Sequence, residues 1–350
     1  MNTKIIYLDE NKIDQSEIKI AGRILFNGGL VAFPTETVYG LGADATNIEA
    51  VKKIFEAKGR PQDNPLIVHI ADFEDIKEYV LEVSSIAQKI MEAFWPGPLT
   101  IILKKSSKIP SVTSAGLESV GIRMPVNIIA RELIRAAGVA IAAPSANISG
   151  RPSPTEVERC IEDLMGKVDC IVGGGSCEFG VESTIVDCTV DPPCILRPGA
   201  ITVEMLRDFD KRIYIDKAIM KKPGLDFKPK APGMKYRHYA PKAPLKIVRG
   251  DLKKTVAKIN EIVQNYMDDK KLVGIMATDE TICQYLQGQV VSLGSRKDLK
   301  TIAQNLFETL RSFDDMKVDV IVSEAFDEAG IGIAVMNRLN KSAGFDIINV

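Results

Sequence analysis

A basic, proline-rich stretch divides this chain into two parts. Residues 217–244 contain five prolines, two glycines, seven lysines and one arginine, but only one acidic residue, Asp226. Proline removes backbone donors, and the low apolar content leaves little to bury, so we interpret residues 213–244 as a linker. Because 350 residues also exceed what one hydrophobic core usually serves, we predict two domains, residues 1–212 and 245–350.

The first part alternates short apolar strands with amphipathic helices. Within residues 48–58, Val51, Ile54 and Phe55 are spaced to share one helix face. Further helices are expected over residues 73–81 and 85–94. Strands are expected over residues 30–34, 66–70, 99–104, 120–124, 139–143 and 170–172. This mixture predicts an α/β domain built on a large, twisted mixed sheet with an open cleft.

The second part repeats the rhythm on a smaller scale. Strands are expected over residues 245–248, 272–276, 290–293 and 318–322. Helices fit between them over residues 252–266, 281–286 and 299–313. This alternation predicts a small, Rossmann-like α/β domain. The pair Gly330 and Gly332 lacks the third glycine of a dinucleotide fingerprint, so it is weak evidence for a nucleotide site.

Composition narrows the classes of function. The net charge of −1 gives no overall positive field, so a polyanion could bind only at a local basic patch. No apolar run reaches the ~18 residues that span a bilayer, and the first 20 residues lack a secretory h-region. We therefore expect a cytoplasmic protein with no membrane partner. Six cysteines without a C-x-x-C pair and only two histidines argue against a structural zinc site.

Two clusters of charge favour anionic ligands. Lys58 and Arg60 follow a predicted helix, and Asn64 adds an amide nearby, an array that suits phosphate oxygens. The alternative is a helix C-terminus, which cations also favour. Arg123 lies inside an apolar strand, where an unpaired cation is costly to bury. It should therefore meet an anion, either an internal carboxylate or a ligand's.

Hydroxyl and glycine residues follow other predicted strands. They occupy residues 34–42, 143–155 and 173–185, positions suited to lining a crevice, although satisfied turns would look similar. His69 lies among apolar neighbours, where a structural role is the alternative. No G-x-x-x-x-G-K-[ST] loop and no protein-kinase signature occurs, so an ATP enzyme of this sequence would need another phosphate cradle.

Together these segments resemble the threonylcarbamoyl-AMP synthases, the YrdC-like superfamily, in its two-domain form. The resemblance rests on P-T-E-T-V-Y-G-L-G from Pro34, K-G-R-P-x-x-N-P-L from Lys58, P-G-P-L-T from Pro96 and G-I-R-M-P from Gly121. It continues with A-P-S-A-N-x-S-G-x-P-S-P-T from Ala143, E-S-T-I-V-D from Glu182, L-R-P-G from Leu196 and P-G-M-K-Y-R-H-Y-A-P from Pro232.

The resemblance implies a cleft that holds L-threonine and ATP side by side. It assigns threonine to Thr37, His69, Arg123, the backbone of Ala143, and Ser183. It assigns ATP to Arg60, Asn64, Ser119, Ser145, Ser153, Arg197 and Tyr239. Lys58 and Arg60 would act on the phosphates, with Mg²⁺ as cofactor, and the linker segment 236–239 would close over the nucleotide.

The implied reaction joins L-threonine, bicarbonate and ATP into threonylcarbamoyl-AMP, for modification of tRNA next to the anticodon by a downstream transferase. Two other readings stay open. The basic cleft could accept RNA, although no RNP or KH pattern occurs. Carbamoyl transfer from carbamoyl phosphate, as in related hydrogenase-maturation domains, is the rival reaction. The role of the second domain is also open.

Overall fold

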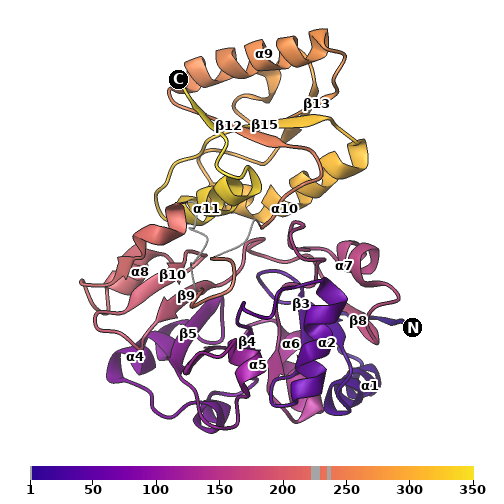
Figure 1. Cartoon of the computed structure of the whole chain (residues 1–350), viewed down its shortest axis with the longest axis vertical. Helices are drawn as coiled ribbons and strands as arrows, with labels where there is room; N and C mark the ends of the chain where they lie inside the picture. The colour runs from indigo at the N-terminus through magenta and orange to yellow at the C-terminus, as the bar shows by residue number, and fades with distance from the viewer. Residues whose placement is uncertain (1, 222–228, 235–237) are drawn as a thin grey trace. The chain divides into compact units, whose positions relative to one another are not determined.

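The computed structural model describes residues 2–221, 229–234 and 238–350, which divide into two compact units. The first unit comprises Met1–Ser149 and Ser153–Tyr236, and the second comprises Gly150–Pro152 and Arg237–Val350. Figure 1 labels the elements along the chain. None of the helices in the described ranges is long and apolar enough to cross a membrane.

The first unit is built on an eleven-stranded sheet with the order β1-β8-β2-β3-β7-β4-β6-β5-β9-β10-β11. Parallel and antiparallel neighbours alternate irregularly along it, so the predicted mixed sheet is confirmed. The strands are β1 (Lys4–Tyr7), β2 (Val31–Phe33), β3 (Gly40–Asp44), β4 (Ile67–His69), β5 (Leu99–Lys104), β6 (Ser119–Arg123), β7 (Ile141–Ala142), β8 (Cys170–Gly173), β9 (Thr184–Asp187), β10 (Cys194–Arg197) and β11 (Tyr214–Ile215).

Helices pack against this sheet through apolar faces. They are α1 (Gln15–Phe26), α2 (Ile48–Lys58), α3 (Ile76–Tyr79), α4 (Ser85–Phe94), α5 (Ser111–Ser114), α6 (Ile128–Ala137), α7 (Val157–Leu164) and α8 (Val203–Arg207), with 3₁₀ turns η1 (Phe73–Asp75) and η2 (Lys217–Met220). The predicted helix over 73–81 is thus a 3₁₀ turn followed by one short helix.

Helix α2 shows how the sequence sets a local structure that matters for the site. The side chain of Asn47 accepts hydrogen bonds from the backbone N–H groups of Glu49 and Ala50, which caps the helix at its start. The helix stops at Gly59, whose φ of 60° lies in the left-handed region that glycine adopts without strain. The backbone N–H of Arg60 then returns to the carbonyl of Phe55. This turn fixes Lys58 and Arg60 on either side of one glycine.

The second unit is a five-stranded, wholly parallel sheet with the order β14-β13-β15-β12-β16. Its strands are β12 (Leu245–Arg249), β13 (Val273–Ala277), β14 (Gln289–Ser292), β15 (Val320–Glu324) and β16 (Ile347–Asn349). Its helices are α9 (Leu252–Asp268), α10 (Leu299–Met316) and α11 (Gly332–Ser342), with the 3₁₀ turn η3 (Ile282–Gln284). Helix α9 covers one face and α10 and α11 the other (Figure 1), as a Rossmann-like domain requires.

Part of the predicted linker is packed rather than extended. Strand β11 pairs in parallel with β10, and turn η2 follows it. Ile219, Ala231 and Met234 are buried in one apolar cluster with Ile102 and Leu196 of the sheet. Low apolar content therefore hid this packing, in which Ile215 and Met220 also contact the cluster. Residues 222–228 and 235–237 of the predicted linker lie outside the described residues.

Candidate active site

The predicted site residues meet on one face of the large sheet, around β6. Side chains alternate between the two faces along a strand. Val120 and Ile122 point into the main core, whereas Ser119, Gly121 and Arg123 belong to the opposite face. One face of β6 therefore packs in the core, and the other face can contact a ligand.

Strand register extends that face into a row of polar side chains. His69 of β4 and Thr100 of β5 are both partners of Arg123 in the β-ladders. Ile185 of β9 pairs with Thr100, and Arg197 of β10 pairs with Ile185. Neighbouring strands lie about 4.8 Å apart, so residues far apart in sequence become adjacent here.

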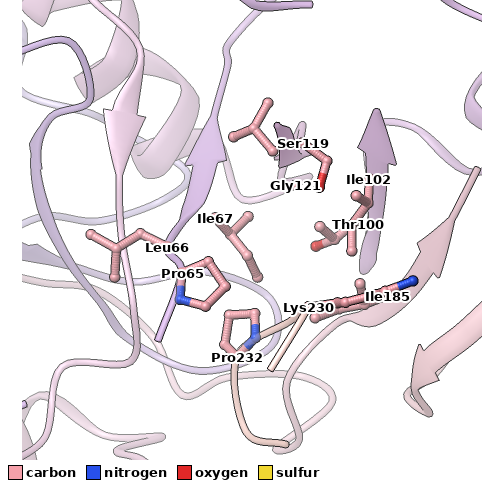
Figure 2. Close-up of a pocket in the computed structure, with 11 residues that line it drawn as sticks. Pro65, Leu66, Ile67, Thr100, Ile102, Ser119, Gly121, Ile185, Lys230 and Pro232 are labelled. Atoms are coloured by element: carbon pink, nitrogen blue, oxygen red, sulfur yellow. The ribbon is translucent and has the colours of Figure 1, made fainter. Parts of the chain in front are cut away.

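The same face forms a small pocket that is open to solvent, here called the apolar pocket because most of its lining residues are apolar. Figure 2 shows its side chains gathered around one hollow. Its walls come from four strands and from Lys230 and Pro232 of the 213–244 range. The lining residues are Pro65, Leu66, Ile67, Thr100, Ile102, Ser119, Val120, Gly121, Ile185, Lys230 and Pro232. A polar edge beside an apolar floor suits a ligand with a charged end and a flat, less polar end.

Arg123 meets the anion that the sequence analysis required. Its guanidinium lies 2.7 Å from Glu36 Oε1, and both side chains are almost fully buried. Arg123 Nη2 also donates to Thr35 Oγ1 at 3.4 Å, and Thr35 Oγ1 lies 3.0 Å from Thr37 Oγ1. The loop at 35–37 is therefore held against β6 through this arginine, which brings Thr37 to the site.

His69 is a neutral side chain in this site. It is buried with Phe33 edge-on at a ring-centroid distance of 6.2 Å. Burial, followed by the positive charge of Arg123, lowers the pKa of His69 to about 3. The charge of Arg197 acts in the same direction. At neutral pH the imidazole can therefore hydrogen-bond a substrate without adding positive charge.

Because His69 is neutral in the folded protein, the free energy of unfolding should depend on pH. The unfolded chain protonates His69 near pH 6.5, whereas the folded chain does so only near pH 3. Between these values the unfolded state binds the extra proton, so stability must fall as pH falls. We expect the free energy of unfolding of the wild type to drop by about 2 kcal/mol more than that of His69→Gln between pH 7 and pH 5. Denaturant unfolding of both proteins at both pH values checks this, and parallel curves would contradict it.

Ser183 and Arg197 form the other end of the row. Ser183 Oγ lies 2.8 Å from Thr100 Oγ1 and accepts a hydrogen bond from Arg197 Nη2 at 3.0 Å. Arg197 Nε donates to the Ser183 carbonyl, also at 3.0 Å. Because all three side chains are buried, the serine hydroxyl is held in one orientation beside a cation.

Lys58 and Ser145 are brought together by the loop that follows β7. Lys58 Nζ donates to the Ser145 carbonyl at 2.5 Å and also to the Asn147 carbonyl. Ser145 Oγ lies 2.5 Å from Asn147 Oδ1. The buried ammonium therefore holds this loop in place, a positioning role that the sequence analysis did not foresee. Its predicted contact with phosphates remains a prediction.

Arg60 and Asn64 lie on the segment that leads from α2 to β4. Arg60 Nη2 donates to the carbonyls of Asn64 and Pro65 at 3.5 and 3.4 Å. The amide of Asn64 is buried, and neither its nitrogen nor its oxygen has a hydrogen-bond partner among the described residues. A buried amide without hydrogen bonds costs free energy unless a ligand or water satisfies it. The position of Asn64 therefore agrees with a place in a binding site.

The other predicted residues of the first unit, Ser153, Ser119 and Ala143, each contact a different part of the site. Ser153 Oγ donates to Glu182 Oε1 at 2.6 Å, next to Ser183 in sequence. Ser119 is half-buried in the apolar pocket. The backbone N–H of Ala143 donates to the Ile67 carbonyl at 2.9 Å.

Tyr239 belongs to the second unit, where its ring stacks on Phe307 with a centroid distance of 5.0 Å. Its backbone has a φ of 63°, and the N–H of Ala240 donates to the carbonyl of Gly150 in the same unit. The assignment of Tyr239 to ATP and the closing movement of segment 236–239 remain predictions. Residues 235–237 lie outside the described part of the chain.

The sequence analysis missed Glu36, Thr100 and Gly121 as site residues. Glu36 lay inside a quoted motif, but only the fold shows that its carboxylate faces Arg123. Thr100 and Gly121 lie in strands that read as continuous apolar segments. Period-two alternation of small or polar residues along β6 was the available signal.

Gly121 keeps the floor of the apolar pocket open. A Cβ at this position would lie 3.0 Å from Thr100 Cγ2 and 3.7 Å from Ile67 Cγ1. We expect Gly121→Val to weaken binding of the ligand that occupies this pocket by about 1–3 kcal/mol, the usual cost of overpacking. Calorimetric titration with ATP checks this, with Gly175→Val as the control, because Gly175 is exposed and a Cβ there would meet no atom closer than 3.8 Å. Unchanged ATP affinity in Gly121→Val would place the nucleotide outside this pocket.

Both parts of the chain match known families. Residues 23–199 match the Sua5–YciO–YrdC model, described as telomere recombination, and residues 201–344 match the threonylcarbamoyl-AMP synthase C-terminal domain. A threonylcarbamoyl-AMP synthase of Pyrococcus abyssi is 46% identical over 99% of this chain and 99% of its own length. Another, of Bacillus subtilis, is 47% identical over 97% and 96%.

A solved structure agrees over the same extent. The crystal structure of Pyrococcus abyssi Sua5 complexed with L-threonine is 46% identical, covers 99% of this chain and 100% of its own, and superposes with a TM-score of 0.94. These matches extend over both units and every site segment. The chain therefore belongs to the two-domain threonylcarbamoyl-AMP synthases, a family of tRNA-modifying enzymes.

Proposed function

We propose that this enzyme is a nucleotidyltransferase that joins L-threonine, bicarbonate and ATP into threonylcarbamoyl-AMP and pyrophosphate. The observation that carries the proposal is the single sheet face on which a buried polar row adjoins an apolar pocket. The names of the two relatives and the threonine complex of the Pyrococcus abyssi protein support the same assignment.

The polar row suits L-threonine. Arg123 supplies a buried cation for the amino-acid carboxylate, and Ser183 and Thr37 supply hydroxyls for the substrate hydroxyl. His69 adds a neutral ring from the neighbouring strand. A site that hydrogen-bonds a substrate hydroxyl can discriminate by roughly 10⁴ against an analogue that lacks it.

The apolar pocket and the surrounding cations suit ATP. Ile67, Ile102 and Ile185 line this pocket but are buried in one cluster with apolar side chains of the predicted linker, so the less polar part of the nucleotide would bind at the pocket's open edge. Arg60 and Arg197 would contact phosphates, with Lys58 helping and Asn64, Ser119, Ser145 and Ser153 adding hydrogen bonds. Tyr239 would also contact ATP.

The chemistry then follows from position and fixed charge. Threonine's deprotonated amine attacks the carbon of bicarbonate and water leaves, which gives a carbamate. A carbamate oxygen then attacks the α-phosphorus while the bond to pyrophosphate breaks. Both reactants are anions, so Arg60 and Arg197 would offset their repulsion and the charge that develops on pyrophosphate. Holding both substrates in one orientation can itself supply up to ~7–11 kcal/mol in model systems.

Mg²⁺ would enter with ATP as part of the nucleotide substrate. Within residues 2–221, 229–234 and 238–350, no group of three or more histidine, cysteine or carboxylate side chains could hold a metal ion. Mg²⁺ is commonly held by substrate phosphates, water and only one or two carboxylates, so the chain's own contribution can be small. The product would pass, in the cytoplasm, to a transferase that modifies tRNA.

Pyrophosphate release tests the proposal. The protein is incubated with ATP and Mg²⁺, and L-threonine and bicarbonate are added separately and together. We expect release only when both are present, and L-serine or L-valine in place of threonine should support much less. Release that ignores threonine or bicarbonate would overturn the proposed function. Release with carbamoyl phosphate in place of both would favour the rival reaction.

A further inference from the structure

The polar row contains buried atoms whose hydrogen-bonding capacity is unused. Among the described residues, Glu36 Oε2, Arg123 Nε and His69 Nδ1 are all buried and have no hydrogen-bond partner. All three residues are only 4% exposed. An unsatisfied buried polar group costs about 1–3 kcal/mol, and more when it is charged, so three together in one site call for a ligand that satisfies them.

Two of these atoms belong to one ion pair and are chemically complementary. Arg123 and Glu36 join through Nη2 and Oε1 at 2.7 Å. This contact leaves Nε as a donor on the cation and Oε2 as an acceptor on the anion. A ligand that bridges the pair must therefore present an acceptor to the arginine and a donor to the glutamate.

We propose that Glu36 binds the α-ammonium group of the amino-acid substrate through Oε2, while the α-carboxylate of the same molecule accepts from Arg123 Nε. The inference rests on the proposed function and adds a recognition residue to it. The Arg123–Glu36 ion pair then binds both charged groups of one amino acid.

Charge balance supports this arrangement. The charges of Arg123 and Glu36 cancel, and His69 stays neutral because burial lowers its pKa. An amino-acid zwitterion also has no net charge, so its binding buries no uncompensated charge in this corner of the site. A carboxylic acid without the amine would instead bring a net negative charge close to Glu36.

A structural role for Glu36 predicts something different. If the Glu36 carboxylate only neutralised Arg123, the loss of Glu36 would change the affinity of all carboxylate ligands by the same factor. If Glu36 binds the ammonium, removal should affect only ligands that carry one. The comparison of L-threonine with (R)-3-hydroxybutanoate, which lacks only the amine, separates the two roles.

Calorimetric titration of the full-length wild type and Glu36→Gln with both ligands is the test. We expect the wild type to bind L-threonine about 10–100-fold more tightly than (R)-3-hydroxybutanoate, as one hydrogen bond between charged groups implies. In Glu36→Gln this preference should disappear. Threonine should weaken by about the same factor, and (R)-3-hydroxybutanoate should bind as well as to the wild type or better.

Glu324→Gln is a matched control in the second unit. Glu324 is also fully buried and pairs with Arg296 at the same 2.7 Å. It should share any loss of stability without changing threonine affinity. ATP titration of Glu36→Gln shows whether the rest of the site is intact.

Each outcome bears on a different claim. Equal wild-type affinities for the two ligands would overturn the role of Glu36, even if the variant failed to fold. An equal loss of affinity for both ligands in a folded Glu36→Gln variant that still binds ATP would also overturn the role of Glu36. A wild type that binds ATP but not threonine would instead overturn the proposed function.

Discussion

Replacement of Arg123 by alanine should reduce kcat/KM for L-threonine by about 30-fold or more, since truncation of one partner of a buried charge pair costs about 2–5 kcal/mol or more. The variant loses the cation for the substrate carboxylate and leaves Glu36 buried without its partner at 2.7 Å. ATP binding should change little, because the apolar pocket does not include Arg123. Threonine-dependent pyrophosphate release and ATP titration measure the two effects separately.

Arg135→Ala is the matched control for Arg123→Ala. Arg135 is an exposed arginine on α6 that pairs with Asp72 and Glu132 and does not line the apolar pocket. Its loss should leave threonine use unchanged, because surface ion pairs contribute little to stability. Arg123→Ala with near wild-type kcat/KM for threonine would show that the amino acid binds elsewhere.

Replacement of Arg60 by alanine should impair the use of ATP and leave threonine binding nearly unchanged, the opposite of the result expected for Arg123→Ala. Removal of one fixed group that stabilises transition-state charge typically lowers kcat by ~10²–10³, and we expect that loss here together with weaker ATP binding. Threonine affinity should stay within about twofold, because Arg60 donates to the carbonyls of Asn64 and Pro65 in its own segment. Calorimetric titration with each substrate, combined with single-turnover pyrophosphate release, measures both effects.

Lys53→Ala serves as the control for loss of a cation near α2. Its Nζ donates to the Gly28 carbonyl on the other side of the helix from the site. Wild-type ATP use in Arg60→Ala would remove this residue from the nucleotide site. Loss of threonine affinity in the same variant would show that the two substrate regions are coupled more tightly than their contacts indicate.

The sequence predicted the elements whose periodicity is undisturbed. Helices α2 and α4 and strand β5 begin and end where their apolar patterns predicted. The argument that Arg123 must meet an anion was also correct, because it needed only the cost of a buried charge. The partner could not be named, since the loop that carries Glu36 is distant in sequence from β6.

Other elements were hidden by packing that a single sequence does not display. Strand β3 is glycine-rich, and no strand was predicted there. A Cβ at Gly42 would lie only 2.6 Å from Ile141 Cγ2, so the fold requires glycine in that strand. Helix α11 was missed because its buried residues include Asn337, Arg338 and Lys341, which erase an apolar pattern.

The central claim is that one sheet face binds both substrates, the amino acid on its polar row and the nucleotide on its apolar floor. A crystal structure with L-threonine and a non-hydrolysable ATP analogue tests it directly. We predict the threonine carboxylate on Arg123, its ammonium on Glu36, and the nucleotide at the open edge of the apolar pocket beside Ser119, with its α-phosphate facing the amine. Threonine and nucleotide in separate cavities, or a nucleotide away from β6, would contradict it.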